Sequence, residues 1–207
     1  MGKIVFMFPG QGAQYVGMGK DFYDSFACSK EIFDKANEVL DIDVKKLCFE
    51  ENEDINITEY TQAAMVTASV AILKKIEEMG LKPDLTAGLS LGEYTDLIYS
   101  KALSFEDGVK LVQKRGEFMQ DLAPKGDWQM AAILGAQDEK VENLCKKVTD
   151  GFVVPANYNC PGQIVVTGDA KGISNLKELA EVEGIRKFRI LKTAGPFHTE
   201  KLIDSSN

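Results

Sequence analysis

The amino-acid sequence predicts an α/β fold, and three observations carry this prediction. An apolar run over 3–8 ends in a Pro-Gly-Gln-Gly segment at 9–12, which is typical of a buried parallel strand that enters a glycine-rich loop. A second short strand is expected over 84–89, and it leads directly to a sharp turn at Ser90. The stretch 128–192 has the element order β-α-β-β-α-β, which is the order of a ferredoxin-like domain.

The large domain is expected to contain the first two strands and four helices. Hydrophobic periodicity predicts helices over 18–40, 60–79, 93–100 and 105–121. The helix over 60–79 carries Ala, Val, Ile and Met on nearly every face, which indicates that it is buried, and Gly80 and Pro83 end it. Two strands are fewer than an open α/β sheet usually has, so we expect the 207 residues to be a fragment or a shortened form of a longer protein.

The small domain is expected to be inserted between the region of Ser90 and the region of His198. Its strands are predicted at 128–136, 152–158, 163–167 and 186–191, and its helices at 138–149 and 170–183. The expected division is a large catalytic domain over 1–124, the ferredoxin-like domain over 125–192, and an incomplete return to the large domain over 193–207.

Composition and charge argue against several classes of function. The net charge of −8 is unlike that of a nucleic-acid binder, which usually presents a basic face. No apolar run is long enough to span a membrane, and the first apolar segment is too short for a signal peptide. The four cysteines are scattered without a Cys-x-x-Cys pair, so we expect no structural metal, no disulfide framework and a reducing, cytoplasmic setting.

The segment Gly88-Leu89-Ser90-Leu91-Gly92 makes Ser90 the first candidate for chemistry. A strand, a sharp turn at serine and a helix are the context in which a Gly-x-Ser-x-Gly motif presents a nucleophile, so the large domain is expected to be α/β-hydrolase-like. A serine hydroxyl needs a base and a site for the developing oxyanion, and the Leu91 amide points to that site. The alternative is a turn of small residues between a strand and a helix.

Three further features are candidate partners of Ser90. His198 is the only histidine in the chain and therefore the only imidazole base available, unless it is a surface or packing residue. Arg115 carries a guanidinium suited to binding a carboxylate, unless it is a solvated helix charge like Lys114. The glycine-rich loop at 9–13 is neither a P-loop nor a dinucleotide fingerprint, and it supplies a second oxyanion donor unless it is an ordinary turn.

Taken together, these segments resemble the malonyl-CoA:acyl carrier protein transacylase family. The similar pieces follow the family's order over almost the whole chain, and their combination is highly specific. They are Phe8-Pro-Gly-Gln-Gly-Ala-Gln14, Thr61-Gln-Ala-Ala64, Gly88-Leu-Ser-Leu-Gly-Glu-Tyr94, Val112-Gln-Lys-Arg-Gly116, Asn157-Tyr-Asn-Cys-Pro-Gly-Gln163 and Gly195-Pro-Phe-His198.

The resemblance implies a ping-pong mechanism that serves fatty-acid biosynthesis without a cofactor or a metal. Ser90 takes the malonyl group from malonyl-CoA as an acyl-serine, and His198 acts as the base for Ser90 and then as the acid for the leaving thiol. The amides of Gln11 and Leu91 form the oxyanion hole, and Arg115 binds the free carboxylate of the malonyl group. The phosphopantetheine thiol of acyl carrier protein then attacks the acyl-serine.

The sequence departs from the family's pattern in two places. Gln62-Ala63-Ala64 stands where the family commonly has Gln-Pro-Ala. Members of the family also usually continue well beyond residue 207, adding strands and a backbone carbonyl that orients the catalytic histidine. Phe197, beside His198, matches the malonyl-preferring form of the family, in which it fills the space that a methylmalonyl branch would need.

Docking of an acidic carrier protein on this acidic chain requires a local basic patch. The candidates for that patch are Arg186, Lys187, Arg189 and Lys192, with Lys110 and Lys114. Two other classes of function stay open. A serine thioesterase or esterase would use an acidic residue between Ser90 and His198 and would have no use for Arg115. A catalytically incomplete homologue would only bind the carrier protein.

Overall fold

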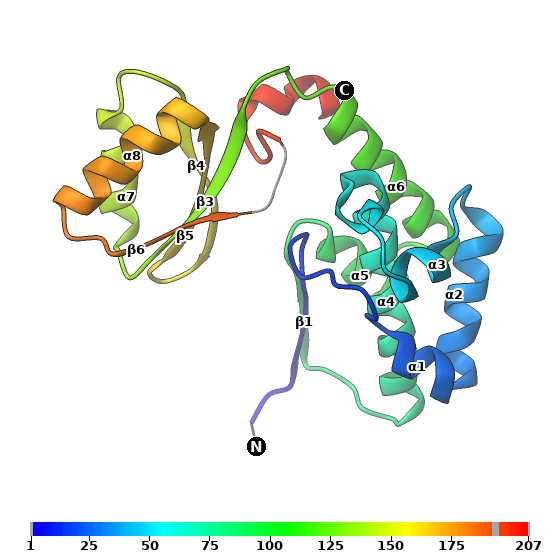
Figure 1. Ribbon diagram of the computed structural model, residues 1–207. Helices are drawn as coiled ribbons and strands as arrows, with labels where there is room; N and C mark the ends of the chain where they lie inside the picture. The colour runs from blue at the N-terminus through cyan, green and yellow to red at the C-terminus, as the bar shows by residue number, and fades with distance from the viewer. Residues whose placement is uncertain (1, 192–194, 207) are drawn as a thin grey trace. The chain divides into compact units, whose positions relative to one another are not determined.

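The structure is a computed structural model that describes residues 2–191 and 195–206. The chain divides into two compact units, and the boundary lies between Glu117 and Phe118. The first unit holds a pair of parallel strands among helices, and the second holds an antiparallel sheet with helices, so the α/β class is confirmed (Figure 1). None of the helices in the described ranges is both long and apolar enough to cross a membrane.

Two short strands, β1 (Val5–Phe8) and β2 (Leu85–Gly88), form the sheet of the first unit. They pair in parallel, from Val5 opposite Leu85 to Phe8 opposite Gly88. A 3₁₀ turn at Asp54–Asn56 precedes the longest helix. The helices are α1 (Lys20–Ser25), α2 (Ala27–Val39), α3 (Val44–Phe49), α4 (Thr58–Glu78), α5 (Gly92–Tyr99) and α6 (Phe105–Asp121), the last of which crosses the boundary between the units.

The prediction of one helix over 18–40 is wrong, because the structure has two. Phe26 has an extended backbone (φ −132°, ψ 122°), and it ends α1 and precedes α2. The sequence also does not predict α3, since six residues carry too little periodicity. Asp43 caps α3 by accepting a hydrogen bond from the Lys46 N–H at 3.0 Å. The other three helices lie close to their expected bounds.

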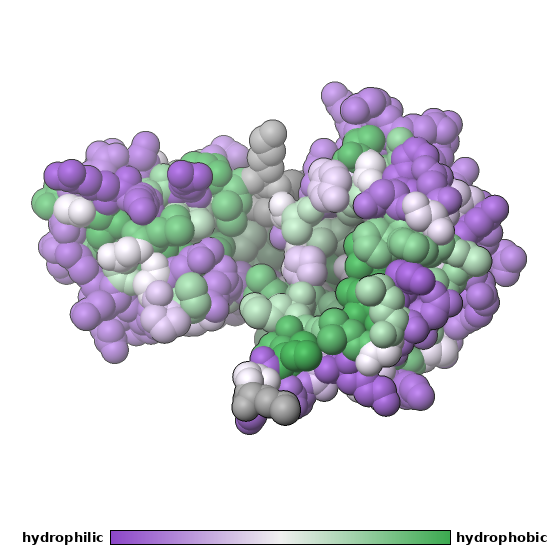
Figure 2. Space-filling model, turned by 90° about the horizontal axis from the view of Figure 1, so that it is seen from below, coloured by the Kyte–Doolittle hydropathy of each residue, from purple (hydrophilic) through white to green (hydrophobic). Residues whose placement is uncertain are grey.

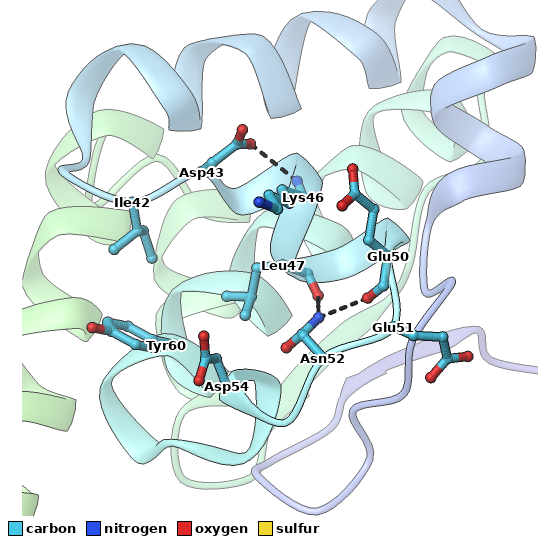
Figure 3. Close-up of a pocket in the computed structure, with 9 residues that line it drawn as sticks. All are labelled: Ile42, Asp43, Lys46, Leu47, Glu50, Glu51, Asn52, Asp54 and Tyr60. Carbon is cyan, nitrogen blue, oxygen red and sulfur yellow. Dashed lines mark hydrogen bonds between the residues drawn. The ribbon is translucent and has the colours of Figure 1, made fainter.

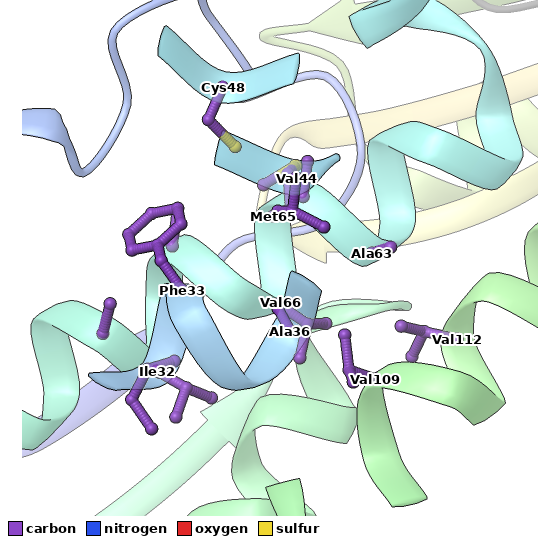
Figure 4. Close-up of a cluster of buried hydrophobic side chains, with 14 of the residues drawn as sticks. Ile32, Phe33, Ala36, Val44, Cys48, Ala63, Met65, Val66, Val109 and Val112 are labelled. Atoms are coloured by element: carbon purple, nitrogen blue, oxygen red, sulfur yellow. The ribbon is translucent and has the colours of Figure 1, made fainter. Parts of the chain in front are cut away.

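Helix α4 is central to the core of the first unit, as its apolar pattern predicts. Ala63 and Val66 of α4 are fully buried in a cluster with Phe33 of α2, Val44 of α3 and Val112 of α6 (Figure 4). Full burial of a Val or Phe side chain contributes about 1.5–3 kcal/mol relative to leaving it exposed. The cluster therefore fixes α4 against three other helices.

Strands β1 and β2 approach the start of α5 so closely that two positions accept only glycine. A Cβ on Gly92 would lie 2.2 Å from the carbonyl oxygen of Phe8, and a Cβ on Gly88 would lie 2.2 Å from the nitrogen of Glu93. These neighbours are backbone atoms, which cannot rotate aside as the end of a side chain can. The two glycines therefore set the spacing between the strands and the helix, and the segment between them contains Ser90.

The two-stranded sheet also leaves apolar side chains at the surface. Met7 is 80% exposed and Leu85 is 57% exposed, and Figure 2 shows hydrophobic surface on the first unit. Within the described ranges each of the two strands pairs with the other alone, so each has one edge without a strand partner. Parallel strands are normally covered on both faces. β1 and β2 thus present both unpaired backbone and apolar side chains to their surroundings.

All six elements predicted for the small domain are present in the second unit. They are β3 (Trp128–Leu134), α7 (Asp138–Lys147), β4 (Val153–Cys160), β5 (Gln163–Asp169), α8 (Ala170–Val182) and β6 (Lys187–Leu191), and a 3₁₀ segment, Glu200–Ser206, follows. The antiparallel sheet has the strand order β4-β5-β3-β6. Strand β4 runs further than expected, so the turn into β5 is shorter and is made at Gly162, whose φ is +79°.

The sheet of the second unit has an apolar layer on each face. On β3, Ala131 and Ile133 belong to the cluster that includes residues of α7 and α8, whereas Met130 and Ala132 belong to a different cluster. This alternation follows from the two-residue period of a strand. The second cluster includes Phe197, so the residue before His198 is anchored on the sheet face opposite the two helices.

Replacing Gly92 by Ala is expected to destabilise the first unit. The added methyl would overlap the Phe8 carbonyl, and overpacking of this kind costs about 1–3 kcal/mol. Denaturant unfolding of Gly92→Ala against the parent protein measures the loss. Gly2→Ala is the control, because a Cβ there meets nothing within 4 Å. Equal unfolding midpoints for Gly92→Ala and the parent protein would contradict the close packing described above.

Candidate active site

Ser90 lies in a strained turn between β2 and α5. Its φ is +54°, a left-handed value that side chains other than glycine rarely adopt and that costs about 1–3 kcal/mol. The Leu89 N–H donates to the Phe8 carbonyl at 3.0 Å, and the Glu93 N–H donates to the Ser90 carbonyl at 3.2 Å. The strand ladder and the first turn of α5 therefore hold this residue from both sides, as a Gly-x-Ser-x-Gly elbow requires.

Two backbone amides beside the turn are suited to stabilise an oxyanion. Leu91 immediately precedes α5, and the Gln11 amide lies in the glycine-rich loop after β1. Within the described part of the chain, neither N–H donates a hydrogen bond to another group. The loop lies against the elbow, because a Cβ on Gly10 would be 2.8 Å from the Leu89 carbonyl oxygen. Free N–H groups at a helix start and a nearby loop are the usual donors of an oxyanion hole.

Two glutamine side chains fix the glycine-rich loop. The side-chain amide of Gln11 donates from Nε2 to Thr58 Oγ1 at 3.3 Å, which connects the loop to the start of α4. Gln14 accepts from the Gly12 N–H at 2.7 Å and donates to Asn56 Oδ1 at 3.2 Å. The position of the Gln11 backbone amide is therefore determined by contacts on both sides of it.

Arg115 of α6 contacts the hydroxyl of Ser90. Its Nη2 donates to Ser90 Oγ at 3.0 Å, and its Nη1 donates to Gln62 Oε1 at 2.6 Å. The guanidinium Cζ lies 5.7 Å from the centroid of the Tyr94 ring. The next residue, Gly116, allows α6 to approach α4, since a Cβ there would lie 2.5 Å from Glu59 Cα. This close packing brings the guanidinium to the elbow.

The surroundings of Arg115 favour an anionic ligand. Burial lowers the pKa of Arg115 from its ordinary value, while the Tyr94 and Glu93 side chains act in the opposite direction. Because an arginine stays protonated in proteins, the result is a half-buried cation without a carboxylate hydrogen-bonded to it in the described structure. A cation that is partly removed from water is stabilised by a carboxylate that binds it in two places.

His198 also has a strained backbone, and it lies in the second unit. Its φ is +59°, and its side chain is exposed. The preceding residue, Phe197, is only 4% exposed, and its carbonyl accepts a hydrogen bond from Thr167 Oγ1 at 3.1 Å. A Cβ on Gly195 would lie 2.5 Å from the Phe197 ring, so the ring folds over a position that needs glycine. The buried Phe197 thus fixes the backbone that presents the imidazole.

Positive φ values single out the two predicted catalytic residues. Among the non-glycine residues of the described ranges, only Ser90, His198 and Lys101 have positive φ. Lys101 has a local cause, because it lies just after the C-cap of α5 and donates its N–H to the Ile98 carbonyl at 3.1 Å. Backbone strain in folded proteins clusters at functional sites. The structure brings Arg115, Leu91 and the Gln11 loop to Ser90, whereas the pairing of Ser90 with His198 stays a prediction.

Sequence reasoning missed two residues of this site. Gln62 is fully buried and accepts from Arg115, and its signal was a long amide side chain inside an otherwise apolar helix. Tyr94 lies beside the Arg115 guanidinium, and its signal was its place four residues after Ser90. Both were quoted only as parts of longer motifs, because the contact partner, Arg115, comes from a distant part of the sequence.

The cations proposed for carrier-protein docking are exposed. Lys187 and Arg189 lie on β6, an edge strand of the second unit, and Arg186 precedes it. Lys110 and Lys114 are exposed on α6, where Lys114 pairs with Glu117 at 2.8 Å. The remaining candidate, Lys192, lies outside the described residues. The docking patch stays a prediction.

The first unit also has a hollow that lacks a candidate nucleophile or base (Figure 3). Its volume is about 290 Å³, and most of the polar side chains that line it are acidic. Its Asp43 carboxylate already caps α3, and Asn52 bonds the carbonyls of Leu47 and Glu50. None of the predicted site residues lines it. The Ser90 elbow therefore stays the candidate site.

Comparison with known proteins identifies what this arrangement is similar to. The acyl transferase domain family matches residues 5–195. The malonyl CoA-acyl carrier protein transacylase of Bacillus subtilis (strain 168) is 47% identical over 203 residues, which are 97% of this chain and 64% of that protein. The chain thus spans slightly less than two thirds of the length of this curated relative.

Solved structures give the same result. The malonyl CoA-acyl carrier protein transacylase from Clostridium perfringens Atcc 13124 has a TM-score of 0.90 and 44% identity, and the match covers 99% of this chain and 65% of that one. A structure of a type II PKS acyl-carrier protein in complex with its malonyl-transacylase has a TM-score of 0.93 and 33% identity, with 99% of this chain and 67% of that one covered.

Replacing Thr167 by Val is expected to weaken the support of His198. The change keeps the side-chain shape but removes the donor to the buried Phe197 carbonyl, which costs about 1–3 kcal/mol of unfolding free energy. Chemical denaturation measures the loss. The matched control is Thr149→Val, because Thr149 is exposed. If both variants unfolded like the parent protein, the hydrogen bond would have no part in fixing the Phe197–His198 backbone.

Proposed function

Because the chain belongs to the acyl transferase domain family, we propose that it transfers a malonyl group from malonyl-CoA to the phosphopantetheine thiol of acyl carrier protein through an acyl-Ser90 intermediate. The observation that carries this proposal is the position of Arg115. A guanidinium 3.0 Å from the candidate nucleophile is what an acyl group with a free carboxylate requires. A plain fatty acyl group has no use for this cation.

The first half-reaction acylates Ser90. His198 takes the proton of Ser90 Oγ as the oxygen attacks the thioester carbonyl carbon, and the amides of Leu91 and Gln11 stabilise the oxyanion that forms. The tetrahedral intermediate then collapses. The carbon–sulfur bond breaks, and His198 returns the proton to the departing sulfur of coenzyme A. Ser90 is left as a malonyl ester, and His198 is neutral again.

Arg115 selects the acyl group. The carboxylate of a malonyl thioester pairs with the half-buried guanidinium, whereas an acetyl group leaves that cation without its counterion. Gln62 accepts from the other nitrogen of Arg115, so the guanidinium keeps its orientation while it binds the substrate. Substrate selection therefore takes place beside the nucleophile, at Arg115 and the Gln62 side chain that orients it.

The second half-reaction uses the carrier protein. Its phosphopantetheine thiol gives a proton to His198 as the sulfur attacks the carbonyl carbon of the malonyl ester. The bond between that carbon and Ser90 Oγ then breaks, and His198 returns the proton to Oγ, which leaves malonyl-carrier protein, free Ser90 and a neutral His198. A related malonyl-transacylase is known in complex with an acyl-carrier protein, which supports this choice of partner. We place the reaction in cytoplasmic fatty-acid biosynthesis, and the four free cysteines are what a reducing compartment permits.

The finer description of the fold is part of the same proposal. We propose an α/β-hydrolase-like large domain, supported by the β2–Ser90–α5 elbow, and a ferredoxin-like small domain, supported by the strand order β4-β5-β3-β6. The domain limits at 124 and 192 stay predictions. Phe197 and Leu202 pack with residues of β3 and β5, so this part of 193–207 has contacts in the second unit.

Incubating the protein with malonyl-CoA is expected to give a malonyl adduct on Ser90, because the elbow presents its hydroxyl to the thioester. Intact-mass measurement detects the adduct, and peptide mapping locates it. Ser90→Ala removes it, while Ser100→Ala, which changes an exposed serine at the end of α5, keeps it.

The fate of the adduct separates the competing functions. A transacylase keeps the adduct in buffer and loses it to holo acyl carrier protein, which gains the malonyl group. A thioesterase would release malonate in buffer without any thiol acceptor. Absence of an adduct, with carrier-protein binding intact, would show a binding homologue and overturn the proposal.

A further inference from the structure

We propose that Tyr94 is a positioning residue whose ring holds the Arg115 guanidinium in the orientation that receives the malonyl carboxylate. The inference rests on the proposed function and goes beyond it, since nothing in the transfer mechanism requires an aromatic residue here. The contact on which it is built is the 5.7 Å separation between Arg115 Cζ and the centroid of the Tyr94 ring. Cation–π attraction is significant within about 6 Å.

Among the described residues, Ser90, Gln62 and Tyr94 contact the guanidinium, and acylation changes only the first of them. Ser90 Oγ accepts from Nη2 in the described structure, and Gln62 Oε1 accepts from Nη1. Acylation converts Ser90 Oγ into an ester oxygen, which is a weaker acceptor and carries the malonyl group. The contact with Ser90 is therefore altered at the moment when Arg115 must be in place.

The Tyr94 ring is unaffected by acylation. It is half-buried and packs against the core of the first unit, so its position is set by the fold. After Ser90 reacts, Arg115 keeps its hydrogen bond to Gln62 and its contact with the Tyr94 ring. Arginine has a long, flexible stem, and a guanidinium held by a single hydrogen bond could rotate about it. The ring restricts that rotation.

The position of Tyr94 follows from the elbow itself. Tyr94 lies in the first turn of α5, and its N–H donates to the Leu91 carbonyl at 3.1 Å. The same turn therefore fixes the Leu91 amide and the Tyr94 ring.

The experiment compares the ring with the hydroxyl at this position. Tyr94→Phe keeps the ring, and Tyr94→Leu and Tyr94→Met remove it with two different side-chain shapes. Tyr99→Leu is the matched control, because it removes the other aromatic ring of α5, whose centroid lies 6.0 Å from that of the Phe6 ring. For each variant the measurement is kcat and KM for malonyl-CoA and for acetyl-CoA, with a carrier-protein thiol as the acceptor.

Loss of the ring is expected to lower the malonyl-to-acetyl ratio of kcat/KM by about 5- to 30-fold, the range expected for a partly desolvated cation–π contact. The change should come from a higher KM for malonyl-CoA, with acetyl transfer unchanged. The ratio in Tyr94→Phe and in Tyr99→Leu should stay within about 2-fold of that in the parent protein. A merely structural role would lower both transfer activities together and leave the ratio unchanged.

Suppose that the parent protein transfers malonyl groups but the malonyl-to-acetyl ratio of kcat/KM is unchanged in Tyr94→Leu and Tyr94→Met. The inference about Tyr94 would then be overturned, and the proposed function would stand. A Tyr94→Phe variant as impaired in the ratio as Tyr94→Leu would also overturn the inference, because the hydroxyl would then be the important group. If the parent protein transferred no malonyl group at all, the proposed function would fail and this inference would fail with it.

Discussion

The hydrogen bond from Arg115 to Ser90 joins parts of the first unit that are far apart in the sequence. Arg115 comes from α6, Gln62 comes from α4, and Ser90 comes from the turn after β2. The contact exists only because α4 is buried in the core and because Gly116 lets α6 approach it. A half-buried cation at a nucleophile is unfavourable without a counterion, and this explains why the site suits a carboxylate-bearing acyl group.

Backbone crowding supplies the second constraint. Gly88 and Gly92 have no room for a Cβ, and Ser90, midway between them, has a positive φ. The elbow is therefore fixed by backbone atoms of β1, β2 and α5 rather than by side chains. At His198 the crowding comes from a side chain instead, since Gly195 makes room for the Phe197 ring, and the strained His198 follows Phe197. Strain at both residues is maintained by packing that surrounds them.

Most of the helices and strands, and the elbow at Ser90, could be predicted from the sequence, because hydrophobic periodicity and turn residues are local features. The strand before Ser90, the helix after it and the β-α-β-β-α-β order of the second unit all follow from periodicity and turn residues within short windows. The break at Phe26 and the six-residue α3 could not be predicted, since neither disturbs the apolar pattern enough to be seen. Gln62 and Tyr94 were missed for a different reason. Their partner, Arg115, comes close only in the folded chain.

The most direct test of the account is the substrate preference of Arg115→Ala. The ratio of kcat/KM for malonyl-CoA to that for acetyl-CoA should fall at least about 30-fold, because the malonyl carboxylate would lose the half-buried cation that binds it. Lys114→Ala, which removes the exposed cation next to it, should leave the ratio unchanged. Equal ratios in Arg115→Ala and the parent protein would show that the guanidinium beside Ser90 does not choose the acyl group, and would contradict the account.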